Sequence, residues 1–289
     1  MQVRRSISLC FVLAVFAAAF FSSCKKKKET MFESLSASET NIGFVNKLEN
    51  KEMFNILYYL YYYNGGGVAT GDINNDGLPD IYFTANSKGN NKLYLNKGNF
   101  IFEDITAQAG VAGSADWCSG VTMADVNGDG FLDIYVMASS QHHGLNGHNE
   151  LFINNKNNSF TESSEKYGLN FSGFGTQAAF FDYDHDGDLD CYLLNHSQKP
   201  NSNIRDTSNR RKPDAFSGDR LYRNDLDSTG KFTDVSAQAG IFQSNLGYGL
   251  GIATGDFNND GWDDIYVGND FHENDYYYIN NGNGTFTES

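Results

Sequence analysis

DVNGDGFLD, at residues 125–133, is one of four closely similar stretches that decide the fold of this chain. The others are DINNDGLPD at 72–80, DYDHDGDLD at 182–190 and DFNNDGWDD at 256–264. Each has oxygen-bearing side chains at positions 1, 3, 5 and 9, and a glycine at position 6 that permits a sharp turn. Calcium is bound by about six to eight oxygens, so each stretch predicts a loop around about one calcium ion. The predicted metal ligands are Asp72, Asn74, Asp76, Asp80, Asp125, Asn127, Asp129, Asp133, Asp182, Asp184, Asp186, Asp190, Asp256, Asn258, Asp260 and Asp264.

The residues around these loops distinguish them from the EF-hand. An EF-hand carries a bidentate glutamate at position 12 and lies between two helices. Position 12 is apolar in all four copies, as Phe83, Val136, Leu193 and Val267. The flanks, such as GVAT at 67–70 and DIYF at 80–83, are rich in β-branched and aromatic residues. We therefore expect each loop to join two strands of a buried sheet.

Composition and charge are typical of an acidic, turn-rich β protein. The chain has 289 residues, of which 40% are hydrophobic, with 30 Gly, 23 Phe, 17 Tyr and only 3 Pro. Its formal net charge is −15, and the four loops contain 15 Asp, so the excess charge lies where bound cations would neutralise it. A nucleic acid partner is disfavoured, because phosphate contacts need a basic surface.

Two further motifs follow each loop and extend the repeat to about four strands. One resembles Leu-Tyr-x-Asn, at 93–96, 151–154, 221–224 and 277–280; the other begins with Phe, at 102–105, 160–163, 232–235 and 286–289. The loops start 53, 57 and 74 residues apart, a spacing that fits propeller blades, which bury their faces against one another. We expect an all-β fold, a β-propeller of four-stranded blades, rather than a β-solenoid with its shorter repeats. The expected blades are approximately 64–112, 113–172, 173–242 and 243–289.

The segment 32–63, before the first blade, is expected to close the ring. Residues 32–35 match the motif that begins with Phe, which predicts an outer strand that completes the last blade. The chain also ends on this motif. The four visible blades therefore predict an incomplete ring, a fragment of a longer propeller; a compact four-bladed ring is the alternative.

Residues 1–23 have the features of an export signal. Arg4 and Arg5 precede an apolar stretch at 9–21, which is too short for a comfortable membrane span. The small residue before Cys24 resembles a lipobox, which predicts lipidation of Cys24 and attachment to a membrane through this N-terminal anchor. Cleavage as an ordinary signal peptide is the alternative. Residues 24–31 would form a basic tether. We expect a lipoprotein of the cell envelope, in the outer membrane, and the sequence does not decide between its periplasmic and its surface side.

Two cysteines remain after Cys24. Cys118 and Cys191 fall on predicted strands at non-equivalent positions of neighbouring repeats. We expect buried free thiols, although an exported protein can also form a disulfide.

The repeated loop, its Gly-x-x-x-Gly lead-in and the Leu-Tyr-x-Asn segment together resemble the FG-GAP or VCBS repeats of integrin α-subunit propellers. With the lipobox and the stretch FNILYY…YNGGG between 54 and 67, the chain is similar to bacterial VCBS-repeat lipoproteins. Those often carry a C-terminal ASPIC/UnbV domain, which is not visible here. The resemblance covers roughly residues 32–289. It implies calcium in the hairpin between the first two strands of each blade, and it implies no reaction, because propellers host many unrelated activities.

A partner is expected on the rim opposite the acidic loops, where the second and third strands of each blade are joined. The third repeat has a long connection there, from about 197 to 219, with basic residues; the second repeat has two adjacent histidines. The candidate partner contacts are Arg210, Arg211, Lys212, His142 and His143. The alternative is a tolerated surface insertion. We expect solvated loop histidines rather than a transition-metal site for this rim, which also includes His148, His196 and His272.

Three classes of function remain open. The first is a non-enzymatic, calcium-binding scaffold that binds a glycan or a protein at the envelope. The second is a propeller-based glycan-active enzyme, and the third is a purely structural assembly element. An enzyme needs its own acid, base or nucleophile, but the repeated loops account for nearly every conspicuous carboxylate. The remaining Glu150, Glu165 and Glu273 are isolated in the sequence, so we favour the binding scaffold.

Overall fold

The computed structural model describes residues 30–48, 52–141, 144–197 and 207–289, which belong to two compact units, 1–36 and 37–289. In the first unit, residues 30–36 form no strand, and the Phe32 side chain is 84% exposed. The outer strand expected at 32–35 is therefore wrong for these residues: none of them is hydrogen-bonded into a sheet. The predicted signal at 1–23, Cys24 and most of the basic tether lie outside the described residues.

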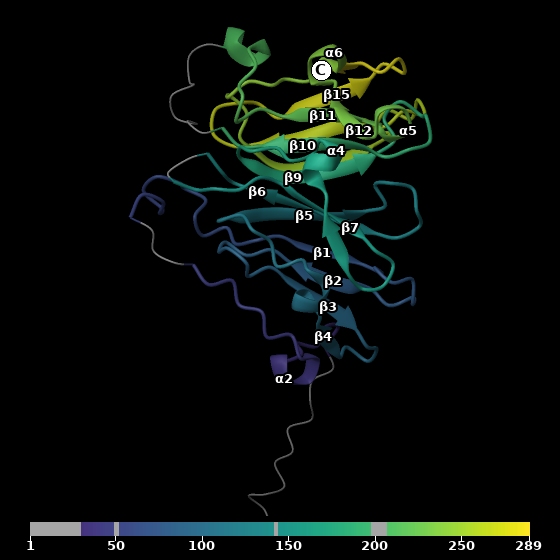
Figure 1. Cartoon of the computed structure of the whole chain (residues 1–289). Coiled ribbons are helices and arrows are strands. Elements are labelled where there is room, and N and C mark those ends of the chain that lie inside the picture. Colours follow the sequence, from purple (N-terminus) through teal and green to yellow (C-terminus); the bar gives the residue numbers. More distant parts are fainter. Residues whose placement is uncertain (1–29, 49–51, 142–143, 198–206) are drawn as a thin grey trace, which may run out of the picture. The chain divides into compact units, whose positions relative to one another are not determined.

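The second unit is built from four-stranded antiparallel sheets, the blades of an incomplete β-propeller (Figure 1). Its described part contains four such sheets, each with its strands hydrogen-bonded in chain order. Blade 1 is β1 (Val68–Gly71), β2 (Asp80–Phe83), β3 (Lys92–Asn96) and β4 (Phe102–Asp104); blade 2 is β5 (Cys118–Ala124), β6 (Asp133–Ala138), β7 (Glu150–Asn154) and β8 (Phe160–Glu162). Blade 3 is β9 (Gly175–Phe181), β10 (Asp190–Asn195), β11 (Arg220–Asp225) and β12 (Lys231–Asp234); blade 4 is β13 (Gly249–Gly255), β14 (Asp264–Asn269), β15 (Tyr276–Asn280) and β16 (Phe286–Glu288). The expected all-β fold is confirmed.

Each acidic loop joins the first two strands of its blade, which confirms that strands and not helices flank it. The residue before the loop pairs with the aspartate at position 9 in every blade. These pairs are Gly71 with Asp80, Ala124 with Asp133, Phe181 with Asp190, and Gly255 with Asp264. Because strands one and two are antiparallel, the acidic loops share one rim. We call it the acidic rim, and we call the other end of these strands the opposite rim.

The core lies between successive blades. All six residues of β6 are buried, and consecutive side chains of a strand point to opposite faces of the sheet. Ile134 and Val136 therefore pack toward blade 1, whereas Tyr135 and Met137 pack toward blade 3. Blades 3 and 4 share a third cluster of this kind. Cys118 and Cys191 lie in these clusters as buried free thiols, as expected.

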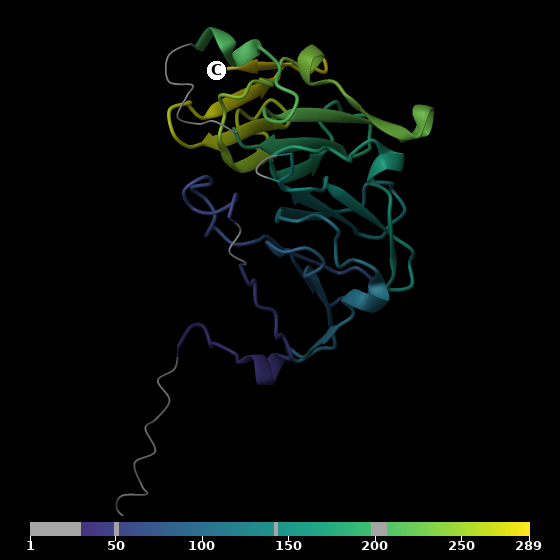
Figure 2. The same cartoon turned by 60° about the vertical axis from the view of Figure 1, so that its left-hand side comes forward.

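The innermost strands of neighbouring blades, β1, β5, β9 and β13, lie side by side (Figures 1 and 2). Hydroxyl groups bond one blade to the next: the Ser119 Oγ donates to the Gly175 carbonyl at 2.6 Å, and the Thr122 Oγ1 donates to the Ala178 carbonyl at 2.6 Å. Glycine permits the close approach, since a Cβ at Gly120 would lie 2.2 Å from the Thr176 carbonyl oxygen. The inner wall thus leaves no room for a side chain at that position.

Short helices connect these elements. They are α2 (Ala37–Thr40), α3 (Thr106–Ala109), α4 (Ser164–Tyr167), η2 (Thr207–Arg211), α5 (Leu226–Thr229) and α6 (Ser236–Ala239). Where the outer strand leads to the next blade, α3, α4 and α6 each end at a glycine in the left-handed conformation: Gly110, Gly168 and Gly240. None of the described helices is long and apolar enough to cross a membrane.

Residues 52–64 form turns rather than a strand, and we call them the cap segment. Phe54 and Tyr62 are fully buried against Trp117 of blade 2. Tyr61, further along, packs against Tyr248, which directly precedes blade 4. A segment far from blades 2–4 in sequence therefore covers part of their opposite rim (Figure 2).

Candidate functional site

The aspartate at position 1 of each acidic loop holds the turn together. In blade 2, Asp125 accepts hydrogen bonds from the backbone N–H groups of Asp129, at 2.9 Å, and Gly130, at 2.7 Å. The equivalent pairs of bonds form at Asp72, Asp182 and Asp256. The loop geometry that the sequence predicts is thus fixed by the first aspartate, and it turns the second and third ligand positions back toward the first.

The aspartate at position 9 is buried at the base of the loop. The Asp133 carboxylate accepts hydrogen bonds from the N–H of Val126, within its own loop, and from the N–H of Asn154, on β7. Asp80 and Asp190 do the same in their blades, and Asp264 accepts the corresponding bond from Asn280. Burial raises the pKa of Asp133 to about 7 and that of Asp190 to about 8, with further raising by the neighbouring aspartates. These carboxylates are strained electrostatically, and a cation would relieve that strain.

The third loop shows the fit to a cation most directly. Asp182, Asp184 and Asp190 each offer a carboxylate oxygen, and the three oxygens lie within 4.8 Å of one another. The Asp184 Oδ1 is buried and has no hydrogen-bond partner among the described residues. In the first and fourth loops, position 3 is asparagine, and its amide donates to the aspartate at position 5. The oxygen set of the third loop suits a hard cation such as calcium.

In blades 2, 3 and 4, the asparagine of the Leu-Tyr-x-Asn motif bonds the acidic loop of its own blade to the loop of the preceding blade. The Asn154 Nδ2 donates to the carbonyl of Ile73 in blade 1, at 2.8 Å, and to the carbonyl of Leu132 in its own blade, at 3.0 Å. The same pair of bonds forms at Asn224, to Val126 and Leu189, and at Asn280, to Tyr183 and Asp263. In blade 1, Asn96 donates to Pro79 of its own blade. The motif was visible in the sequence, but this role was not.

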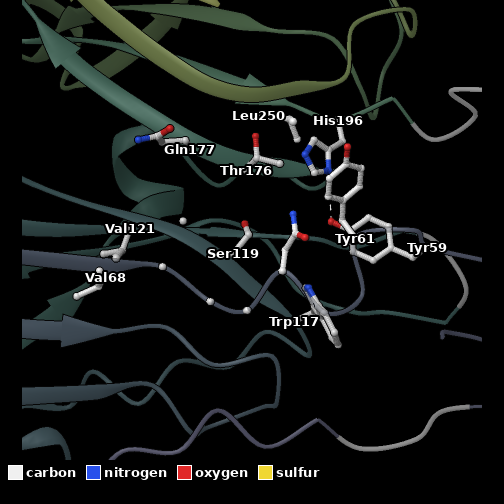
Figure 3. A pocket seen from close by; sticks show the side chains of 15 residues that line it. Tyr59, Tyr61, Val68, Trp117, Ser119, Val121, Thr176, Gln177, His196 and Leu250 are labelled. Carbon is white, nitrogen blue, oxygen red and sulfur yellow. Dashed lines mark hydrogen bonds between the residues drawn. The ribbon is translucent and has the colours of Figure 1, made fainter. Parts of the chain in front are cut away.

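The opposite rim contains a pocket of about 280 Å³ at the start of the inner strands (Figure 3). Three of these strands bulge there: the ladder skips Ser119 and Gly120 in β5, Thr176 in β9, and Leu250 in β13. All four bulge residues line the pocket. Bulges frequently occur beside binding sites, where they redirect side chains. Because the bulge recurs in three blades, we infer that the opposite rim has a defined backbone geometry at this pocket.

Aromatic side chains of the cap segment form another wall of this pocket. Tyr59 and Tyr61 lie beside His196, and the Tyr59 hydroxyl is 3.3 Å from the His196 Nδ1 (Figure 3). The His196 ring also stacks on Tyr248 at 4.1 Å. Burial lowers the pKa of His196 to about 3, so the ring is neutral at physiological pH. The expectation of a solvated loop histidine is therefore wrong for His196, because the distant cap segment covers it.

Arg210, Arg211 and Lys212, the candidate partner contacts in the long connection of the third repeat, interact with other residues of this chain. The Arg210 Nε lies 2.6 Å from the Glu273 Oε1, and the Arg211 guanidinium lies over the Phe242 ring at 5.2 Å. Lys212 lines a separate polar pocket. These interactions anchor the connection to neighbouring segments, and none of the three residues lines the aromatic pocket. His142 and His143 lie outside the described residues.

Two of the glutamates that looked isolated in the sequence have defined surroundings. Glu273 pairs with Arg210, and only 6% of its side chain is exposed. Glu150 is buried, and its Oε1 accepts hydrogen bonds from the N–H and the hydroxyl of Ser114. Burial raises the pKa of Glu150. Each of these glutamates contacts a residue that is distant in the sequence, and the sequence alone did not predict these contacts.

The sequence comparison agrees with this geometry. The FG-GAP-like repeat model matches residues 72–136, 138–193 and 256–289, more than half of the chain. The chain belongs to the FG-GAP-like repeat family. The first matched segment of this FG-GAP-like chain contains the acidic loops at 72–80 and 125–133, the second contains the loop at 182–190, and the third contains the loop at 256–264.

Curated relatives match only part of this FG-GAP-like protein. Cartilage acidic protein 1 of Xenopus tropicalis is 33% identical over 138 residues, which cover 46% of this chain and 20% of the relative. The mouse protein of the same name is 42% identical over 73 residues, covering 25% of this chain and 11% of the relative. The chain therefore spans a fifth or less of the relatives it matches. A solved structure of an Agrocybe aegerita lectin, described as recognising non-reducing terminal N-acetylglucosamine, has a TM-score of 0.43 and 19% identity, covering 76% of this chain and 50% of that one.

Proposed function

We propose that this FG-GAP-like protein is a non-enzymatic, calcium-binding scaffold that binds a glycan or a protein on the rim opposite its acidic loops. The single observation that carries this proposal is the pocket built from the bulges of three inner strands and the cap segment. Among the described residues that line it, none is an aspartate or a glutamate. An acid–base pair for glycan cleavage is therefore lacking in this pocket, which supports binding rather than catalysis.

Calcium is proposed to be structural, with about one ion in each acidic loop. The ligands would be the side chains at positions 1, 3, 5 and 9, and the third loop offers the closest set of carboxylates. When bound, the ion neutralises carboxylates that otherwise repel one another. The bonds made by the first aspartate shape the loop, and those made by the ninth connect it to the third strand of the blade.

We further propose that the protein is a bacterial VCBS-repeat lipoprotein of the cell envelope, anchored in the outer membrane through lipidated Cys24, and of the type that often carries an ASPIC/UnbV domain. The lipobox-like sequence before Cys24 supports the anchor. Cys24→Ala is expected to move the protein from the membrane fraction to the soluble fraction, and mass spectrometry of the wild-type N-terminus should find a lipid on Cys24. An unmodified mature N-terminus downstream of Cys24 would refute the anchor.

The scaffold proposal is tested by screening the purified protein on a glycan array and against envelope proteins. We expect a ligand that is recovered chemically unchanged. Its binding should survive Asp129→Ala in the acidic loop of blade 2, provided that the variant is measured while folded. Turnover of the ligand would favour the enzyme instead. Loss of binding in folded Asp129→Ala would place the ions within the binding site.

A further inference from the structure

The pocket at the opposite rim is lined by Trp117, whose indole N–H is a hydrogen-bond donor. Trp117 is 2% exposed and is held by edge contacts with Phe54 at 4.8 Å and Tyr59 at 6.3 Å. Its indole N–H makes no hydrogen bond within the described part of the chain. In Figure 3 the indole nitrogen lies on the side of the ring that faces Ser119 and the middle of the pocket. A tryptophan whose ring is largely buried usually gives its N–H a partner, so a donor in the wall of this pocket points to a ligand.

The pocket also offers polar groups beyond the indole. Gln177 of β9 also lines it, beside Thr176, and its amide group makes no hydrogen bond to the described residues (Figure 3). A primary amide presents two donors and one acceptor oxygen, whereas the indole presents one donor. Because both residues line the same cavity, a ligand that reaches both would receive hydrogen bonds from two parts of its wall.

Charge and volume restrict the ligand. The described residues lining the pocket include no Asp, Glu, Lys or Arg, and His196 is kept neutral by burial. A charged ligand would lose its hydration without gaining a counter-charge. The volume of about 280 Å³ lies just below the usual range for small-molecule sites, roughly 300 to 1,000 Å³, so the ligand group is small.

The walls combine aromatic faces with polar groups. Tyr59 and Tyr61 line one side, Val68 and Val121 the other, and Ser119 lies between them (Figure 3). A pyranose ring has apolar C–H faces that pack against aromatic rings, and its hydroxyls both donate and accept hydrogen bonds around the ring. An extended peptide is less suited, because a strand added to a sheet needs a free edge, whereas the edge strands β5 and β9 each lie against the inner strands of the blades on both sides.

We propose that this pocket binds one neutral sugar ring of a saccharide, with the Trp117 indole and the Gln177 amide as its hydrogen-bonding groups and the cap-segment tyrosines as its packing surface. The inference rests on the proposed scaffold function and gives it a ligand class and a site. It makes the cap segment part of the binding site rather than a connector to the first blade.

Titrations with glucose, galactose, mannose and glucuronate test the proposal in matched variants. The chain has two tryptophans, and Trp262 stacks on His185 in an acidic loop, away from the pocket. In Trp262→Phe, the remaining tryptophan reports on the pocket alone. We expect at least one neutral hexose to shift the fluorescence of Trp117 in this variant. Calorimetry should give the variant the same affinity for that hexose as the wild-type protein. Glucuronate should bind much more weakly.

Trp117→Phe keeps one aromatic ring at this position and removes the N–H donor together with the five-membered ring of the indole. We expect it to weaken hexose binding about ten-fold, which corresponds to about 1.4 kcal/mol. Gln177→Ala, at a half-buried position on β9, should weaken binding in the same direction and carries little risk to folding.

Three results would overturn the proposal: no hexose binds, glucuronate binds as well as the neutral sugars, or a neutral tripeptide binds more tightly than any hexose. Unchanged hexose affinity in both Trp117→Phe and Gln177→Ala would also overturn it. None of these results refutes the scaffold function, which is judged by the array and envelope-protein screen and by recovery of an unchanged ligand.

Discussion

Asn154→Ala should destabilise the protein markedly because this one amide joins two blades. The side chain donates to Ile73 of blade 1 and to Leu132, and its oxygen accepts from the N–H of Lys156 at 2.8 Å. Asn154 is 4% exposed, so water does not replace the lost bonds readily. At about 1 kcal/mol for each hydrogen bond, we expect a loss of about 3 kcal/mol in the free energy of unfolding.

Asn96→Ala is the matched control. Asn96 occupies the same motif position in blade 1, where its amide donates to Pro79 and its oxygen accepts from Gly98, both within the blade. It therefore lacks the bond to a preceding blade, and it is less buried than Asn154. We expect a loss of about 1 kcal/mol, since solvent compensates in part for exposed bonds. The difference between the two variants reports on the contact between blades.

Urea denaturation, followed by tyrosine and tryptophan fluorescence, would measure both losses. Calorimetry should show the same order, at about 2–4 °C for each kcal/mol in a domain of this size. Asn154→Asp adds a sharper comparison: it keeps the acceptor but places a carboxylate oxygen against two buried carbonyls, and it should cost at least as much as Asn154→Ala. Equal losses for Asn154→Ala and Asn96→Ala would refute the reasoning, because the bond between blades would then contribute nothing.

Three further predictions concern the ions, the carboxylates and the inner wall. Chelation with excess EGTA should lower the melting temperature substantially, and an unchanged melt would refute the structural role of calcium. In calcium-depleted protein, the free energy of unfolding should fall as the pH rises from about 4, the ordinary pKa of aspartate, to about 8. The reason is that the folded state retains protons on Asp133 and Asp190 over this range. Urea denaturation at several pH values should show that the free energy of unfolding depends less steeply on pH in Asp190→Asn. Gly120→Ala should cost about 1–3 kcal/mol, since its Cβ would meet the Thr176 carbonyl at 2.2 Å, whereas Gly251→Ala, with no atom within 4 Å, should cost much less in the same urea assay.

The sequence predicted those parts of the structure that depend on local spacing. Position 9 of each loop both ends the turn and begins a strand, so Asp133 fixes the loop, the hairpin and the register with Ala124 at once. The apolar residue at position 12, Val136 in blade 2, excluded the EF-hand because it belongs to a buried strand. The repeats then predicted blades, since four equivalent hairpins can bury their faces only against one another.

The cap segment could not be predicted in this way, because its conformation depends on contacts with three blades. Tyr59 meets Trp117, Phe174 and His196, which are separated from it by 58 to 137 residues of sequence. Local pattern suggested a segment that closes the ring and a solvated His196. A usable signal was nevertheless present: the run YYLYYY at 58–63, directly before three glycines, is too aromatic for an exposed connector.

The acidic rim and the pocket lie at opposite ends of the same inner strands, and this separation decides how calcium should influence ligand binding. A seven-residue inner strand such as β5 spans about 23 Å, at roughly 3.3 Å for each residue. The described bonds of the acidic loops run sideways, from Asn154 to Ile73, rather than along β5 toward Ser119. Chelation should therefore lower the stability of the blades while leaving the affinity of the pocket unchanged in protein that is still folded. Hexose titration of Trp262→Phe well below the melting temperature, with and without EGTA, measures this directly. A large loss of affinity in folded, calcium-free protein would show that the two rims are coupled through the strands.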